Sequence, residues 1–110
     1  MKGRELLGEV EHLVLLVIFR LGSGTYAVPI REELRRAGVD LSRGSIYVTL
    51  DRLERNGLVT SELGDPSPER GGRAKRFFRV TPRGLGAARE TQRALIALWR
   101  DVPQLKERRS

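Results

Sequence analysis

The sequence predicts an α+β fold that is mostly α-helical, with one β-hairpin set between helices. Three observations lead to this prediction. Apolar residues recur every three or four positions in several segments, which is the period of an amphipathic helix. Two short segments alternate between apolar and polar residues, as half-buried strands do. The ten residues between those two segments, 64–73, include two prolines and three glycines, and such a stretch forms a loop.

The first helix is expected over residues 5–21, where apolar positions cover most of the circumference. A helix that is apolar on most sides is usually buried on several of them. In a chain of 110 residues the core is modest, so we expect part of this surface to meet a second subunit. The residues expected at that contact are Leu6, Val10, Leu13 and Val17. His12 lies on the same helix and is expected to be a hydrogen-bonded structural residue.

Two further helices, over residues 26–37 and 43–55, are joined by a short turn. A proline is tolerated only in the first turn of a helix, so Pro29 places the start of the former near Tyr26. Ser42 is a good N-cap for the latter, and Gly57 ends it. This arrangement, with small polar residues in the first turn of the second helix, indicates a helix-turn-helix.

The two strands are expected over residues 58–63 and 75–81, directly after that pair of helices. A helix-turn-helix followed by a β-hairpin is the order of elements in a winged helix-turn-helix. Successive strand residues point to opposite faces, so one of Phe77 and Phe78 belongs to the core. The other is expected against the first or last helix, with stacking on single-stranded bases as the alternative.

The last helix is expected to begin with Thr81 as N-cap and Pro82 as its first residue, and to end near Pro103. Spacings of three and four mark a seam along it that suits a short dimer contact. The seam residues are Leu85, Ala88, Gln92, Leu95, Trp99 and Val102. We therefore divide the chain into a winged helix-turn-helix, 1–81, and a C-terminal dimerisation helix with its tail, 82–110.

The net charge and composition indicate which kind of partner and which cellular setting to expect. The formal net charge of +7 favours a polyanion, either nucleic acid or an anionic membrane surface. The longest apolar run is far shorter than the roughly 20 residues that span a bilayer, and no signal peptide is recognised. The chain has no cysteine, which excludes disulfides and thiolate metal sites. These features predict a cytoplasmic protein that is not inserted in a membrane.

Catalysis is not expected. The chain has a single histidine, no Ser-His-Asp candidate, no metal-ligand cluster and no phosphate-binding loop. We therefore expect neither an enzyme nor a cofactor.

The first turn of the helix over 43–55 carries the residues best suited to DNA: Ser42, Arg43, Gly44 and Ser45. Small residues permit a close approach, and the free amides at a helix N-terminus favour phosphate. In the major groove, Arg43 can bind guanine through two hydrogen bonds, and Ser45 can reach a base or a phosphate. The alternative is that Ser42 only caps the helix and Arg43 is only solvated.

Three residues farther along this helix are also candidates. Thr49 is expected to reach a base or a phosphate. Tyr47 is expected either to bind a phosphate or to lie wedged between helices. Arg52 is expected either to contact the DNA backbone or to pair with a neighbouring acid.

The hairpin carries a second basic group, Arg70, Arg73, Lys75 and Arg76. A glycine-rich basic loop that follows a recognition helix suits phosphate or minor-groove contact. The alternative is a solvated loop whose charge maintains solubility.

By these residues the chain resembles the PadR family of transcriptional regulators. The resemblance is carried by segments 9–16 (EVEHLVLL), 26–30 (YAVPI), 42–54 (SRGSIYVTLDRLE), 56–59 (NGLV) and 69–81 (ERGGRAKRFFRVT). It implies a cytoplasmic homodimer that is usually a repressor, in the short form with a single C-terminal helix. It also implies an approach of Tyr26 to the DNA backbone and a response to a small molecule.

Trp99 leaves two roles open. On a dimer seam, two such rings can line a cavity for a small aromatic effector, as the family resemblance implies, or simply anchor the dimer. Two functions also remain open for the whole chain. One is a repressor that binds double-stranded DNA at a palindromic operator, and the other is a winged-helix protein-interaction module with an acidic partner.

Overall fold

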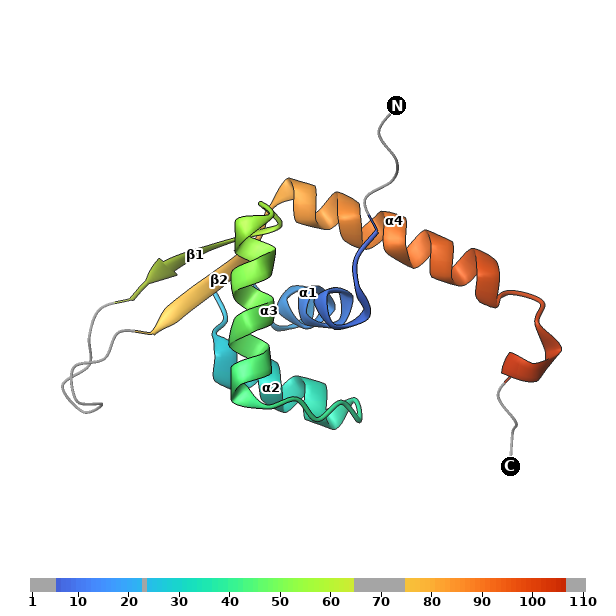
Figure 1. Ribbon diagram of the computed structural model, residues 1–110, viewed down its shortest axis with the longest axis horizontal. Helices are drawn as coiled ribbons and strands as arrows, with labels where there is room; N and C mark the ends of the chain where they lie inside the picture. Colours follow the sequence, from blue (N-terminus) through green and yellow to red (C-terminus); the bar gives the residue numbers. More distant parts are fainter. Residues whose placement is uncertain (1–5, 23, 65–74, 107–110) are drawn as a thin grey trace.

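The computed structural model describes residues 6–22, 24–64 and 75–106 and confirms a mostly helical α+β fold (Figure 1). Within these ranges the elements are α1 (Glu9–Leu21), α2 (Ala27–Arg36), α3 (Arg43–Arg55), β1 (Val59–Leu63), β2 (Arg76–Val80), α4 (Pro82–Trp99) and a 3-10 turn, η2 (Pro103–Leu105). In these ranges, no helix is both long and apolar enough to cross a membrane.

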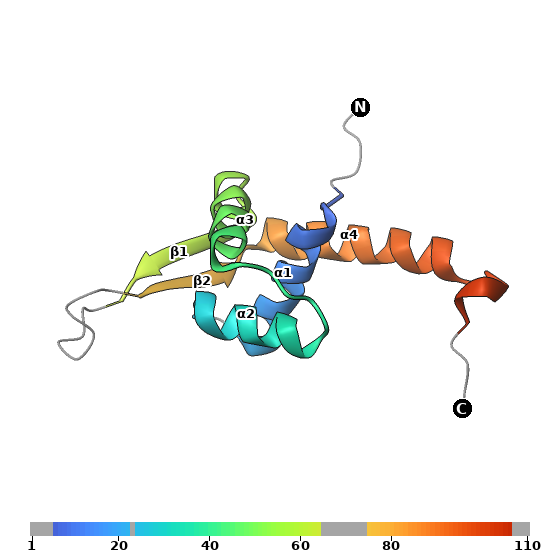
Figure 2. The ribbon, with the colours of Figure 1, turned by 60° about the horizontal axis from the view of Figure 1, so that its bottom comes forward.

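Helix α1 is the centre of the core. It contacts α2, α3, α4 and β2, and in both ribbon views it lies in the middle of the molecule (Figures 1 and 2). Leu15 and Ile18 of α1 are fully buried together with large apolar side chains from α2, α3, β1 and β2. Those side chains are Ile30, Leu34, Ile46, Leu50, Leu53, Val59 and Phe78. The predicted apolar stripes of α2 and α3 therefore do face one common interior.

Two predicted helix boundaries are wrong. Helix α1 begins at Glu9 rather than at residue 5, because the Gly8 amide donates to Glu11 Oε1 at 3.1 Å and caps the helix there. Before it, the Leu7 amide donates to Thr91 Oγ1 of α4 at 3.0 Å, which ties the N-terminal segment to α4. Helix α4 ends at Trp99, and Asp101 has a left-handed φ of 63°. Leu6 and Val102 are therefore not helical: Leu6 precedes α1, and the expected seam on the last helix loses its C-terminal end.

The sheet consists of β1 and β2 in antiparallel register, with Val59 opposite Val80 and Leu63 opposite Arg76. Phe78 lies on the inner face and is completely buried, as expected for one of the two phenylalanines. Its amide donates to the Thr25 carbonyl at 2.7 Å, which joins the start of α2 to β2. Phe77 lies on the opposite face of the strand, is only partly buried, and has its ring edge-on to that of Tyr26.

The junction between β2 and α4 is tightly packed. The Thr81 amide donates to the Leu58 carbonyl at 3.0 Å, and the Thr81 hydroxyl donates to the Gly57 carbonyl at 2.7 Å. The same hydroxyl accepts from the Gly84 amide and caps α4. A Cβ on Gly84 would lie only 2.1 Å from the Leu58 carbonyl oxygen, so only glycine fits at this contact.

Helix α4 has two halves with different surroundings. Ala87, Ala88 and Thr91, all within its first ten residues, are buried against the rest of the chain. Its second half projects past the other helices, as both views show (Figures 1 and 2).

We predict that Gly84→Ala lowers the free energy of unfolding by about 2–3 kcal/mol or more, because a backbone carbonyl cannot move aside for the new methyl group. The matched control is Gly86→Ala on the same helix, where an added Cβ meets nothing within 4 Å. That control should be neutral or stabilising by about 0.5–1 kcal/mol, since alanine has the higher helix propensity. Urea unfolding followed by circular dichroism measures both, and equal effects would refute the contact.

Candidate nucleic-acid interface

The N-terminal turn of α3 is exposed and well formed. The Ser42 hydroxyl accepts from the Ser45 amide at 3.0 Å, so Ser42 caps the helix as predicted. Arg43, Gly44 and Ser45 are all exposed. Ile46, Leu50 and Leu53 point into the core on the opposite side, and this packing fixes which face of α3 meets solvent.

Tyr47 lies at the border between α2 and α3. It is 41% exposed, so it is not the wedged core residue that was one of its two expected roles. Together with Val28, Arg35 and Arg43 it lines a hollow of about 240 Å³ between the two helices. The Arg31 Nε group donates to the Leu41 carbonyl at 2.8 Å and thereby holds the turn that joins these helices.

The structure corrects the expectation for Thr49. Its side chain is only 6% exposed, and its hydroxyl donates to the Ser45 carbonyl one turn earlier at 2.8 Å. A buried and bonded hydroxyl does not reach a base or a phosphate. Arg52 is exposed, and the acidic neighbours Asp51 and Glu54 bind a different arginine.

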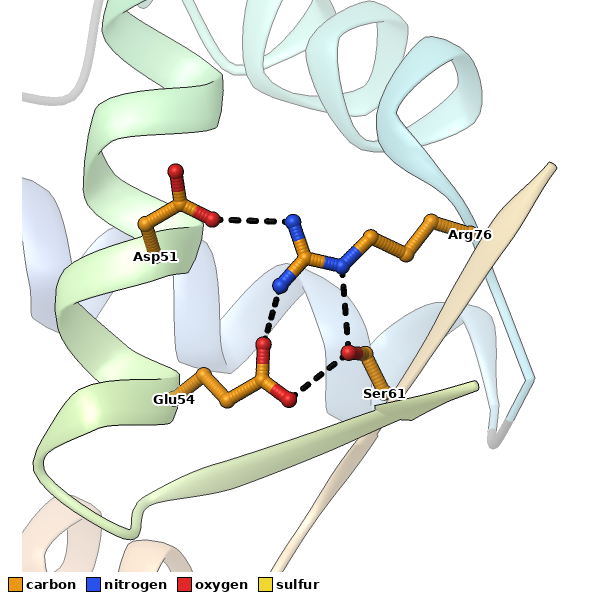
Figure 3. Close-up of polar contacts among 4 residues, drawn as sticks. All are labelled: Asp51, Glu54, Ser61 and Arg76. Atoms are coloured by element: carbon orange, nitrogen blue, oxygen red, sulfur yellow. Dashed lines mark hydrogen bonds and ion pairs between the residues drawn. The ribbon is translucent and has the colours of Figure 1, made fainter. Parts of the chain in front are cut away.

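That arginine is Arg76 of β2, which ties the hairpin to α3 (Figure 3). Its Nη1 donates to Asp51 Oδ1 at 2.9 Å, its Nη2 donates to Glu54 Oε1, and its Nε donates to Ser61 Oγ at 3.1 Å. The Ser61 hydroxyl in turn donates to Glu54 Oε2 at 2.7 Å. Arg76 was predicted to bind DNA, but its guanidinium instead forms an internal network among α3, β1 and β2.

The network changes the charge that α3 presents to a ligand. The hydrogen bond that Arg76 donates to Asp51, together with the one it donates to Glu54, raises the pKa of Arg76 above its usual value, although burial acts in the opposite direction. A raised arginine pKa means that the contact is complete at neutral pH and weakens only in strong alkali. One cation thus offsets two carboxylates that would otherwise repel a polyanion from this side of α3.

Tyr26 and Lys75 lie together at the base of the hairpin. The Lys75 ammonium is 4.1 Å from the centre of the Tyr26 ring, and the Phe77 ring meets Tyr26 edge-on with centroids 5.7 Å apart. Tyr26 also provides the N-cap position of α2. The structure therefore brings these two predicted DNA contacts into one cluster. Arg70 and Arg73 lie outside the described residues.

The residues predicted for a dimer contact separate into two groups. Val17 and Ala88 are buried within the single chain, which corrects the expectation that they face a partner. Val10, Leu13 and Leu85 are partly buried. Gln92 is exposed, and its Oε1 is 3.0 Å from Nε2 of His12, which confirms a structural hydrogen bond for that histidine.

The second half of α4 carries a continuous exposed apolar face. Leu95, Ile96, Leu98 and Trp99 are exposed by 52%, 45%, 78% and 60%. With Gln92 and Arg100, three of them line a hollow of about 570 Å³. Sequence reasoning found Leu95 and Trp99 but missed Ile96 and Leu98, because it followed a single seam; the run of apolar residues at 94–99 was the signal for a wider face.

Comparison with known proteins gives the family. The sequence profile described as "Transcriptional regulator PadR-like family" matches residues 14–90, which extend from α1 into α4. The chain belongs to this family. The resemblance stated from the sequence motifs is therefore confirmed, and a transcriptional regulator agrees with the expectation that the chain is not an enzyme.

Individual relatives agree with this result. The chain is 44% identical to "Transcriptional regulator Rv3488" of Mycobacterium tuberculosis (strain ATCC 25618 / H37Rv) over 73 residues, or 66% of this chain and 64% of that protein. The match thus spans less than two thirds of the relative's length. A PadR-like transcription factor from Bacteroides fragilis has a similar fold, with a TM-score of 0.73, 21% identity and coverage of 88% of this chain and 89% of the other. A PadR family transcriptional regulator from Eggerthella lenta DSM 2243 superposes with a TM-score of 0.70, 27% identity and coverage of 92% and 88%.

We predict that Arg76→Met lowers the free energy of unfolding by about 1–2 kcal/mol, because two carboxylates lose a shared charged donor while the apolar stem is kept. The matched control is Arg35→Met on α2, whose salt bridge to Asp40 is longer, at 3.9 Å, and more exposed. Its effect should stay below about 0.5 kcal/mol. A double-mutant cycle with Asp51→Asn, measured by urea unfolding, should show favourable coupling to Arg76, and additive effects would contradict the network.

Proposed function

We propose that the chain is a sequence-specific DNA-binding repressor that acts as a homodimer in the cytoplasm. The observation that carries this proposal is the exposed, capped N-terminus of α3, where Arg43 stands beside small residues in a chain of the PadR-like family. A helix end of this kind offers free amides and a positive dipole to phosphate, and Arg43 offers a guanidinium to a guanine edge.

The surroundings of α3 support a polyanionic partner. Arg43, Arg52 and Arg55 are exposed on this helix, while its two carboxylates are bound by Arg76. In the proposed complex α3 enters the major groove, and Ser42, Gly44 and Ser45 allow its backbone to approach closely. Tyr26, Tyr47 and Lys75 then contact the phosphates at its edges, and Arg70 and Arg73 of the hairpin extend those contacts.

The proposed homodimer forms through the projecting half of α4. A contiguous apolar surface of this size on a small chain marks an interaction site, and a second copy provides an identical surface to cover it. Two-fold symmetry then implies a palindromic operator with half-sites about 34 Å apart or a multiple of that distance. Leu95, Ile96, Leu98 and Trp99 would form its centre, with Leu13 and Leu85 at its border.

The hollow beside Trp99 supports relief of repression by a small aromatic molecule. Its lining is mainly apolar, with one amide and one guanidinium from Gln92 and Arg100. This is the usual composition of a site that binds a flat apolar ligand and orients it with a few polar groups.

The alternative function is a protein-interaction module whose basic surface binds an acidic protein. Salt-sensitive binding does not separate the two functions, because both are electrostatic. Enrichment of particular duplexes from a random DNA pool does separate them, since an acidic protein site has no reason to select a base sequence.

We predict that Arg43→Ala reduces the preference for the enriched duplex over random DNA by about tenfold or more, because a two-hydrogen-bond contact to guanine provides about 1–3 kcal/mol of discrimination. The matched control, Arg89→Ala, removes the same charge from an exposed site on α4. Fluorescence anisotropy at fixed salt measures both variants. If Arg43→Ala keeps the wild-type preference, Arg43 is not a base contact.

We predict that Leu95→Asp converts the dimer into a monomer at micromolar concentration, because it places a charge in the apolar contact. The control, Leu63→Asp, makes the same change at an exposed leucine at the end of β1 and should leave the dimer intact. Sedimentation velocity distinguishes the species. A monomeric wild-type protein would refute the proposed homodimer.

A further inference from the structure

The outward face of α3 has an apolar side chain near its centre. Val48 is 57% exposed, although Ile46, Leu50 and Leu53 of the same helix are buried. Residues four apart lie on one face of a helix, so Gly44 precedes Val48 by one turn and Arg52 follows it by one turn. Val48 is therefore directly in line with the N-terminal turn that the proposed function places in the major groove.

Val48 has no part in the core, and single exposed apolar residues are common on proteins. The position of Val48, on the outward face of α3, suggests a role for its exposure. Gly44 has no side chain, and a Cβ placed there would meet only the Ser42 hydroxyl, at 3.9 Å. The isopropyl group of Val48 thus follows a stretch of bare helix backbone, and the exposed Arg52 lies one turn farther along the same face.

The chemistry of this side chain restricts what it can recognise. Valine neither donates nor accepts a hydrogen bond, so it gains nothing from the nitrogen and oxygen atoms along the groove. The one apolar group on a base edge in the major groove is the C5-methyl of thymine. We infer that Val48 is a specificity-determining residue that contacts a thymine methyl in each half-site, close to the base pair that Arg43 contacts.

This inference rests on the proposed DNA binding and adds the class of base pair that the protein selects. Arginine contact favours a G·C pair, whereas Val48 favours a T·A pair on the same stretch of groove. The expected half-site therefore contains a guanine and a nearby thymine whose methyl group, rather than its hydrogen-bonding atoms, is recognised.

The test uses the full chain and a duplex enriched from a random pool. Each thymine position is replaced in turn, in both half-sites, by deoxyuridine, which removes only the methyl group. We expect one position at which the wild-type affinity falls roughly fourfold per half-site, as for the loss of one buried methyl group. Val48→Ser should bind the thymine duplex more weakly and be insensitive to deoxyuridine at that position.

The matched control is Leu63→Ser at the end of β1, where an exposed aliphatic side chain outside α3 is replaced by the same residue. It should keep the wild-type response to deoxyuridine. Serine and valine have similar helix propensities, and equal melting temperatures check that both variants are folded. Enrichment of a sequence without a deoxyuridine effect, or an unchanged effect in Val48→Ser, overturns the inference and leaves the repressor proposal intact. Failure to enrich any sequence overturns both.

Discussion

The close approach of Gly84 to the Leu58 carbonyl determines how α3 and α4 are oriented relative to each other. Leu58 lies three residues beyond the end of α3, and Gly84 lies in the first turn of α4, so this contact joins the end of α3 to the start of α4. Thr81 reinforces the junction with hydrogen bonds to Gly57 and Leu58 and with the cap of α4. In the proposed dimer, the distance between the two α3 helices depends on the angle that this junction sets between α3 and α4.

Charge is distributed unevenly between the two faces of α3. Its outward arginines remain exposed, while Asp51 and Glu54 are held by Arg76 on the side of the hairpin. The same interaction therefore attaches the hairpin to the helix and reduces the negative potential beside it. In the proposed complex, Arg76 would therefore act through Asp51 and Glu54 rather than through a contact of its own.

Much of this arrangement follows from sequence periodicity, because burial of the apolar stripes on α1, α2 and α3 determines their packing. The Ser42 and Thr81 caps were also predictable, since a small hydroxyl residue before an apolar-periodic segment has one common role. The roles of Arg76 and Thr49 were not predictable. They depend on which carboxylate or carbonyl lies within reach across elements, and spacing along one chain carries no such information.

Boundaries were the other point of failure. The start of α1 is set by Glu11, whose side chain accepts a hydrogen bond from the Gly8 amide three residues earlier. The end of α4 was placed too late, because the apolar spacing continues to Val102 although the helix ends at Trp99. The wide apolar face on 95–99 was underestimated because a seam of one residue per turn was followed.

The projecting half of α4 has a consequence for how the chain behaves at different abundances. In the proposed dimer, the apolar face of α4 is covered only when two copies meet, so association and operator occupancy would draw on the same pool of chains. By mass action, the concentration of the dimer varies with the square of the monomer concentration, so dilution reduces the dimer more strongly than the monomer. A modest change in the synthesis of this chain would therefore produce a more than proportional change in the fraction of target sites that are occupied.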